Sequence, residues 1–147
     1  MPTSAAGLPF SFQHLSLAAG VRAAMHRNPA KIACRHGDRT RSYAELMSRI
    51  DRVSSALCAG LGLKPGQHGA IIAKNSIEYL EIVIGASQAG IALATVNPRL
   101  SAAEMVGICD DAGVAVVFAD PDAMAMLRDA KLASVPTLIE IGPAMET

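Results

Sequence analysis

The chain has 147 residues, which is enough for one hydrophobic core of ordinary size. Lysine and arginine total 13 and so do aspartate and glutamate, and this zero formal charge argues against nucleic-acid binding and against a basic patch for membrane surfaces. Hydrophobic residues make up 51% and charged residues 18%, which favours a domain with a buried parallel sheet or a piece whose apolar surface meets something larger.

No segment predicts export or membrane insertion. The first ten residues lack a basic start followed by an apolar core, so we expect no secretory signal. The longest uncharged run, residues 82–98, is too short and too polar to span a bilayer. Cys34, Cys58 and Cys109 lie far apart and are expected to be reduced, buried structural thiols. These features indicate a soluble, cytoplasmic protein.

The N-terminal part predicts a helix followed by a hairpin. Residues 1–12 have no periodicity and are expected to form a loose lead-in. Apolar residues on one face predict a helix over residues 13–27, which an Asn-Pro pair ends. Residues 32–36 and 39–41 flank a Gly-Asp turn and predict a short β-hairpin.

A second helix follows the hairpin. Ser42 and Glu45 have the spacing of a capping box, which satisfies two backbone donors at a helix start. The helix continues to about Gly60, and Arg49 and Arg52 point away from its apolar face, which predicts that both are solvated. That face is formed by four apolar residues at helical spacing, namely Leu46, Ile50, Val53 and Leu57. A short buried strand is expected over residues 69–73.

The centre of the chain predicts a buried helix and a strand. Asn75 and Ser76 are candidate N-caps, and Glu78 stands at capping-box spacing from Asn75. Gly90 is suited to the left-handed conformation that ends such a helix. Residues 91–96 are apolar without a charge, which predicts a central strand covered on both faces. The expected inward face of the helix consists of Ile77, Leu80, Val83, Ile84 and Ser87, widened by Ile82 and Ala86.

Alternating helices and strands continue to the end. Ser101 and Glu104 predict a capped helix over residues 101–112, with Met105, Ile108 and Cys109 directed inward. A strand is expected over residues 114–119. Asp120-Pro121 begins a further helix that presents Met124, Leu127 and Leu132, and residues 137–141 form a last strand.

This order of elements predicts the fold class. Strands that alternate with helices of this length indicate a layered α/β fold with a mainly parallel sheet, flanking helices and a short N-terminal β-hairpin. No repeat, low-complexity run or linker interrupts the sequence, so residues 1–147 are expected to form a single domain.

Most motifs that would carry chemistry are absent. The four histidines are scattered, so no metal site is expected, and no phosphate-binding loop or nucleophile elbow occurs. No catalytic residue is therefore predicted. Arg99 is the exception among the charged residues, because it follows the predicted strand at the edge where parallel sheets bind ligands. Its guanidinium is suited to a two-pronged phosphate contact, and the plainer alternative is a surface arginine beside the next helix.

Three sets of short motifs occur in order along the chain. They are the R-S-Y-A-E-L stretch 41–46, K-P-G at 64–66 with N-S at 75–76, and Q-A-G-I-A at 88–92 with N-P-R-L-S at 97–101. With these motifs the sequence resembles the adenylate-forming, AMP-dependent acyl- and aryl-CoA synthetases, specifically their N-terminal part. The match covers about residues 17–132. Gln67, Lys74 and Thr95 depart from the family pattern. These departures affect the assignment to a subfamily more than the assignment to the family.

The resemblance implies a function for the longer enzyme. Such enzymes activate a carboxylic acid with ATP and Mg to an acyl-adenylate and then transfer the acyl group to coenzyme A (CoA). It further implies that Arg99 lies close to the CoA phosphates. The family's phosphate loop and catalytic lysine occur later in the sequence than this region, so the chain is expected to be an N-terminal fragment that is inactive alone and holds no cofactor itself.

A second hypothesis remains open. The chain is alternatively a stand-alone, non-catalytic α/β module for binding or self-assembly, because a sheet edge and excess apolar surface favour association into a homo-oligomer. A third, weaker interpretation is an independent nucleotide-binding domain.

Overall fold

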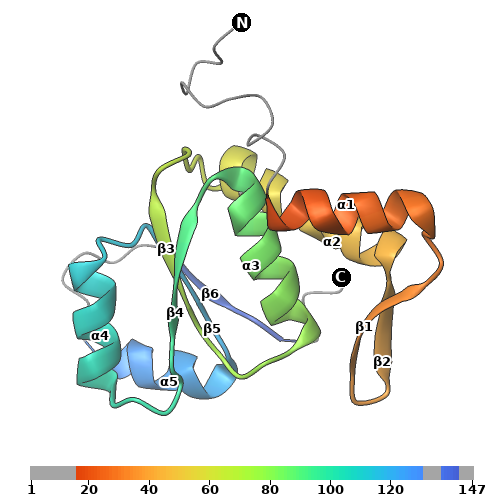
Figure 1. The fold of residues 1–147 in the computed structure, drawn as a ribbon. Coiled ribbons are helices and arrows are strands. Elements are labelled where there is room, and N and C mark those ends of the chain that lie inside the picture. The colour runs from red at the N-terminus through yellow and green to blue at the C-terminus, as the bar shows by residue number, and fades with distance from the viewer. Residues whose placement is uncertain (1–15, 131–136, 143–147) are drawn as a thin grey trace, which may run out of the picture.

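The computed structural model describes residues 16–130 and 137–142. In it a four-stranded sheet carries helices on both faces, and a hairpin with two further helices lies beside it (Figure 1). The α/β class predicted from the sequence is confirmed. The elements are α1 (Leu17–Arg27), β1 (Ile32–His36), β2 (Arg39–Ser42), α2 (Tyr43–Ser55), a π-helical turn (Ala56–Gly60), β3 (His68–Ile72), α3 (Ile77–Ala89), β4 (Ala92–Val96), α4 (Ala102–Asp111), β5 (Val116–Ala119), α5 (Pro121–Asp129) and β6 (Thr137–Glu140).

The strands of the main sheet are parallel and lie in the order β4-β3-β5-β6. Ile71 in β3 is paired with Thr95 of β4 on one side and with Phe118 of β5 on the other. The two inner strands carry apolar residues, and every residue of β5 is buried. This burial follows from the helices that parallel connections place against both faces.

Two hydrophobic clusters fill the spaces between the sheet and its helices. On one face, Ile82 and Ala86 of α3 pack with Ile71 and Phe118. On the other, α4 and α5 contribute Met105, Cys109, Met124 and Leu127, which pack with Ile72 and Val117. Neighbouring residues of one strand thus belong to opposite clusters, as the two-residue period of a strand requires.

A third cluster joins α1 and α2 to the outer side of α3. Leu46 and Ile50 of α2 pack with Ala18 of α1 and Ile84 of α3. The antiparallel hairpin β1–β2 continues from this cluster, at the right of Figure 1. Since α3 contacts both the sheet and this cluster, it is the element that connects the two parts.

Three helices are capped by residues that the sequence predicts as N-caps. Capping boxes form at Ser42 with Glu45 and at Ser101 with Glu104, and Asp120 caps α5 ahead of Pro121. These arrangements need only residues within one turn of each other, which explains why the sequence reveals them. Gly90 ends α3 with φ +74°, as expected.

Two predictions about strand and helix faces are wrong. Among the described strands, β4 is the edge of the sheet rather than a central strand, and its first four residues are partly or fully exposed. The absence of charge in its sequence therefore does not reflect cover on both faces. Ile108 is 39% exposed rather than inward, because α4 rests on the sheet through Met105 and Cys109 instead.

Three further predictions about single residues are corrected. Ser76 alone caps α3 by accepting from the Tyr79 amide, so Glu78 belongs to no capping box. Arg49 is not solvated, since it pairs with a buried carboxylate, whereas Arg52 is exposed as predicted. Among the cysteines only Cys109 is buried; Cys34 is half-buried and Cys58 is exposed.

Each helix within the described ranges is too short or too polar to cross a membrane. The predicted lead-in 1–12, the first residues of the predicted helix 13–27 and Leu132 lie outside the described residues.

Candidate functional site

The strand order places a switch point between β3 and β5. After β3 the chain passes through α3 to β4, which pairs with one side of β3. The next strand, β5, pairs with the other side of β3, and the chain then continues outward to β6. At such a point the loops after neighbouring strands diverge, and open α/β sheets bind ligands in the crevice this leaves at the carboxyl ends of the strands.

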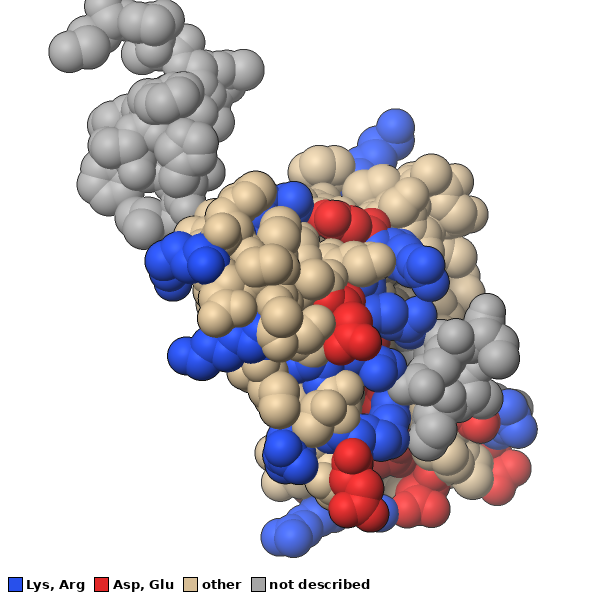
Figure 2. Space-filling view, turned by 90° about the vertical axis from the view of Figure 1, so that its right-hand side faces the viewer, with Lys and Arg blue, Asp and Glu red and all other residues tan. Residues whose placement is uncertain are grey.

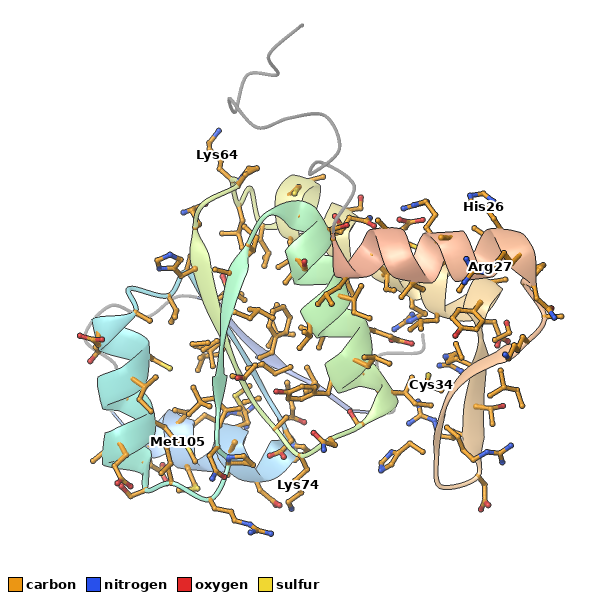
Figure 3. The ribbon with its side chains drawn as sticks, in the orientation of Figure 1. His26, Arg27, Cys34, Lys64, Lys74 and Met105 are labelled. Atoms are coloured by element: carbon orange, nitrogen blue, oxygen red, sulfur yellow. The ribbon has the colours of Figure 1, made fainter. Side chains whose placement is uncertain are left out.

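A cleft of about 290 Å³ lies at this switch point. The loop after β3 supplies Lys74, Asn75 and Ser76, and the loop after β5 supplies Asp120 and Asp122. The hairpin adds His36 and Arg39, and α3 adds Glu78. Figure 3 shows Lys74 at the carboxyl end of the sheet, opposite Lys64, which precedes β3.

Lys74 joins the two loops of the cleft. Its backbone N–H donates to Asp120 Oδ2 at 2.9 Å, and its ammonium group lies 2.7 Å from Asp122 Oδ2. Asp120 Oδ1 accepts from the Ala123 amide, so one carboxylate caps α5 and also holds the end of β3. The hydrogen bond with Asp122 raises the pKa of Lys74, and the same bond lowers the pKa of Asp122.

The opposite wall of the cleft is built from buried charge. Glu78 is 2% exposed and accepts a hydrogen bond from Arg39 of β2. Burial by itself raises the pKa of the Glu78 carboxyl, but the hydrogen bond and positive charge of Arg39, with local hydrogen bonds at the start of α3, outweigh it and leave this pKa below its ordinary value.

A second buried carboxylate lies one turn further along α3. Glu81 is 1% exposed, and its two oxygens lie 3.4 Å from Arg41 Nε and 3.1 Å from Arg49 Nε. The two arginines come from β2 and α2, so Glu81 ties the hairpin and α2 to α3. Figure 2 shows the side of the molecule that carries α1 and the hairpin, where Lys and Arg side chains lie interspersed with acidic ones.

These contacts define what the cleft is suited to do. Lys74 is ion-paired with Asp122 and Arg39 with Glu78, and Asp120 adds a further carboxylate, so the cleft has no excess of positive charge. The described residues contain no group of three or more His, Cys, Asp or Glu placed to hold a metal ion. The arrangement therefore offers a polar surface for binding rather than a concentration of positive charge for phosphate.

Arg99 lies outside the cleft lining. It is exposed in the loop after the edge strand β4, and its backbone N–H donates to Asn97 Oδ1 at 3.0 Å. This bond fixes the turn that leads into α4. Arg99 is thus at the carboxyl end of the sheet, as predicted, but at the edge strand rather than a central one.

Glu78 and Glu81 were missed as site residues by sequence reasoning. Their signal was present, since they are two carboxylates three residues apart in a helix that is otherwise mainly apolar. Carboxylates are rarely buried unless they are paired, so this spacing on a buried helix points to basic partners elsewhere in the chain.

Comparison with known proteins identifies the family. Residues 21–146 match the sequence model of the AMP-binding enzymes. The chain belongs to this family. It is 33% identical over 112 residues to a feruloyl-CoA synthase from Amycolatopsis sp, and 31% identical over 116 residues to a 4-hydroxybenzoate/benzoate CoA ligase from Rhodopseudomonas palustris. The alignments cover 74% and 78% of this chain but 23% and 21% of the relatives.

Solved structures show which fold this region has. An anthranilate CoA ligase in complex with anthranoyl-AMP superimposes with a TM-score of 0.83 at 19% identity, covering 95% of this chain and 27% of that one. A fatty acyl CoA synthetase from Mycobacterium tuberculosis superimposes with 0.81 at 23% identity, covering 89% and 27%. The chain therefore has the fold of the N-terminal region of these synthetases, and it spans less than a quarter of the curated relatives' length.

Proposed function

We propose that this chain supplies the N-terminal part of an ATP-dependent carboxylic acid:CoA ligase. Such an enzyme joins the acid to AMP with release of pyrophosphate and then transfers the acyl group to CoA. The observation that carries the proposal is the family match over residues 21–146, which contains the motifs at 41–46 and 97–101. ATP, Mg and CoA are the cofactors of the proposed ligase, and its partners are small molecules in the cytoplasm.

We also propose that the chain alone does not form adenylates. Stabilising the charge that develops on phosphate during adenylation requires several converging positive groups and a metal ion. In the cleft, Lys74 and Arg39 are paired with Asp122 and Glu78, and this pairing of both positive groups favours a supporting role for the region. The groups that bind ATP are then supplied by the sequence of the ligase that is C-terminal to this region.

Arg99 is proposed to contact the CoA phosphates in that ligase. Its exposed position at the carboxyl end of the sheet, on a turn held by Asn97, supports this role. Among the described residues its side chain has no ion-pair partner, so the guanidinium is available to an anionic ligand.

The test joins this chain to the remaining sequence of a relative. A fusion to the C-terminal part of the feruloyl-CoA synthase is expected to release pyrophosphate from ATP with a suitable aromatic acid, and to form a thioester once CoA is added. The isolated chain is the control and is expected to release none. A folded fusion that makes no adenylate from any of a panel of carboxylic acids contradicts the proposed function, whereas adenylation by the isolated chain contradicts its dependence on later sequence.

A further inference from the structure

A pocket of about 390 Å³ lies where β2 meets the first turns of α2. It shares no lining residue with the polar cleft at the carboxyl ends of the strands. The residues that line it are Arg41 of β2 and Ala44, Glu45, Ser48, Arg49 and Arg52 of α2. Three arginine side chains from two elements thus line one pocket, together with one hydroxyl group and one carboxylate.

Two of these arginines are held in place by a buried carboxylate. Arg41 Nε and Arg49 Nε lie 3.4 and 3.1 Å from the two oxygens of Glu81, and the two arginine side chains are only 18% and 17% exposed. A guanidinium carries five N–H donors, so one that binds a carboxylate can also donate to a second acceptor. Because Glu81 already fixes both side chains, an anion in the pocket would bind them at a low cost in side-chain entropy.

The third arginine, Arg52, has a different environment. It is exposed, and within residues 16–130 and 137–142 its side chain has no hydrogen-bond or ion-pair partner. It follows Arg49 by three residues and so lies one turn further along the same side of α2. The three guanidinium groups are accompanied by two carboxylates, those of Glu45 and Glu81, which leaves one positive charge uncompensated.

The surroundings of the pocket are also positive. Residues 17–55, which form α1, the hairpin and α2, contain eight Lys or Arg and three Asp or Glu. Glu78 and Glu81 of α3 pair with three of these arginines, and positive side chains still outnumber negative ones (Figure 2). The zero formal charge of the chain is therefore unevenly distributed, and this part of the surface attracts anions.

We propose that the pocket beside α2 is a binding site for a phosphate group. A phosphate presents at least three acceptor oxygens, enough for one to meet each guanidinium, whereas a carboxylate presents two. The planar fork of donors in arginine matches this geometry. The phosphate belongs either to a free small molecule or to a lipid headgroup. The site is distinct from the contact proposed for Arg99, and it does not depend on the proposed ligase activity.

Arg52 and Arg27 provide a matched test. Both are exposed arginines without an ion-pair partner in the described part of the chain, but only Arg52 lines the pocket. Figure 3 shows Arg27 at the far end of α1. Arg52→Ala and Arg27→Ala are made in the 147-residue chain, and inorganic pyrophosphate is titrated at constant ionic strength while the NMR signals of the α2 amides are followed. Co-sedimentation with phosphatidylglycerol vesicles is measured for the same proteins.

We expect Arg52→Ala to weaken pyrophosphate binding about ten-fold or more, as the loss of one charged hydrogen bond implies, and Arg27→Ala to change it by less than about two-fold. The same dependence on Arg52 in vesicle binding, without a response to pyrophosphate, would also support the site and assign its phosphate to a lipid.

Two results would overturn the inference. One is equal weakening by both variants, because the effect would then be general attraction to a positive surface. The other is an absence of any shift of the α2 amides with pyrophosphate, combined with vesicle binding that does not depend on Arg52. Since Arg52 is exposed and unpaired, the variant is expected to keep the NMR spectrum of the folded chain, and this spectrum separates lost binding from lost folding.

Discussion

A few buried charged residues fix the position of the hairpin and α2 against α3. Glu81 lies between Arg41 and Arg49, which come from different elements, and Glu78 holds Arg39. A helical wheel of α2 places Arg49 on the polar side and so predicts solvent around it. Its partner is 32 residues away in sequence, and only the packing of α2 against α3 brings the two together.

Replacing Glu81 should therefore lower the free energy of unfolding of the chain. Glu81→Ala leaves two mostly buried guanidinium groups without this carboxylate, and breaking a buried pair by removing one partner costs about 3–5 kcal/mol. Urea unfolding of the isolated chain measures the change. Glu140→Ala is the control, because Glu140 pairs with Arg128 at 3.6 Å between exposed side chains, and such pairs contribute about 0–1 kcal/mol. Similar losses for both variants would contradict this account.

Glu78 should make the stability of the chain depend on acid pH. Its pKa is lowered in the folded state, so its contribution is complete above the unfolded pKa of about 4.3 and is lost as the pH falls through the lower, folded value. We expect Glu78→Gln to flatten the loss of unfolding free energy below about pH 4.5. Thermal melts across pH 3 to 7 would measure it, and an unchanged slope would count against the pairing with Arg39.

Arg99 is a further single residue that can be tested, and the effect of its substitution on CoA binding can be measured only in an active ligase. In the fusion, Arg99→Ala is expected to raise KM for CoA by about 10–100-fold, the equivalent of one charged hydrogen bond of about 1.5–3 kcal/mol. Pyrophosphate release without CoA should continue. Arg128→Ala, on the exposed side of α5, is the matched control. An unchanged KM for CoA would leave Arg99 as a surface residue.

At the scale of elements, α2 and α3 approach closely because Gly85 has no side chain. A Cβ added there would lie 2.7 Å from Val53 Cβ and 3.1 Å from the Ile50 carbonyl oxygen. Gly107 in α4 has nothing within 4 Å of the same position. The two glycines are both helical, so they separate the effect of packing from that of helix propensity.

Gly85→Ala is expected to destabilise the chain by about 1–3 kcal/mol, because the two helices must move apart. Gly107→Ala should instead stabilise it by about 0.5–1 kcal/mol, since alanine loses less conformational entropy in a helix. Chemical denaturation of both variants checks the pair. If Gly85→Ala were as harmless as Gly107→Ala, the close contact of α2 with α3 would not be an important packing constraint.

The whole molecule presents an exposed edge at β4, which among the described strands pairs only with β3. Unpaired backbone groups along such an edge favour association with another copy. We expect the mass of the isolated chain in sedimentation experiments to rise with concentration. Thr95→Lys places a charge at an exposed position of this strand and should lower the association, whereas Ala59→Lys should not. A single-chain mass at all concentrations would argue against self-assembly.

Local patterns in the sequence were sufficient for the α/β class, the order of the elements, the caps at Ser42, Ser101 and Asp120, and the resemblance that led to the family. Each element and each cap rests on residues within a few positions of one another, where periodicity and capping act, and the resemblance rests on short motifs read in their order along the chain. The tertiary structure alone decided that β4 is an edge strand, that Glu78 and Glu81 are buried against arginines, and that a cleft opens between β3 and β5. Those features depend on contacts between segments some 30 or more residues apart, and on which side of β3 the chain places each following strand.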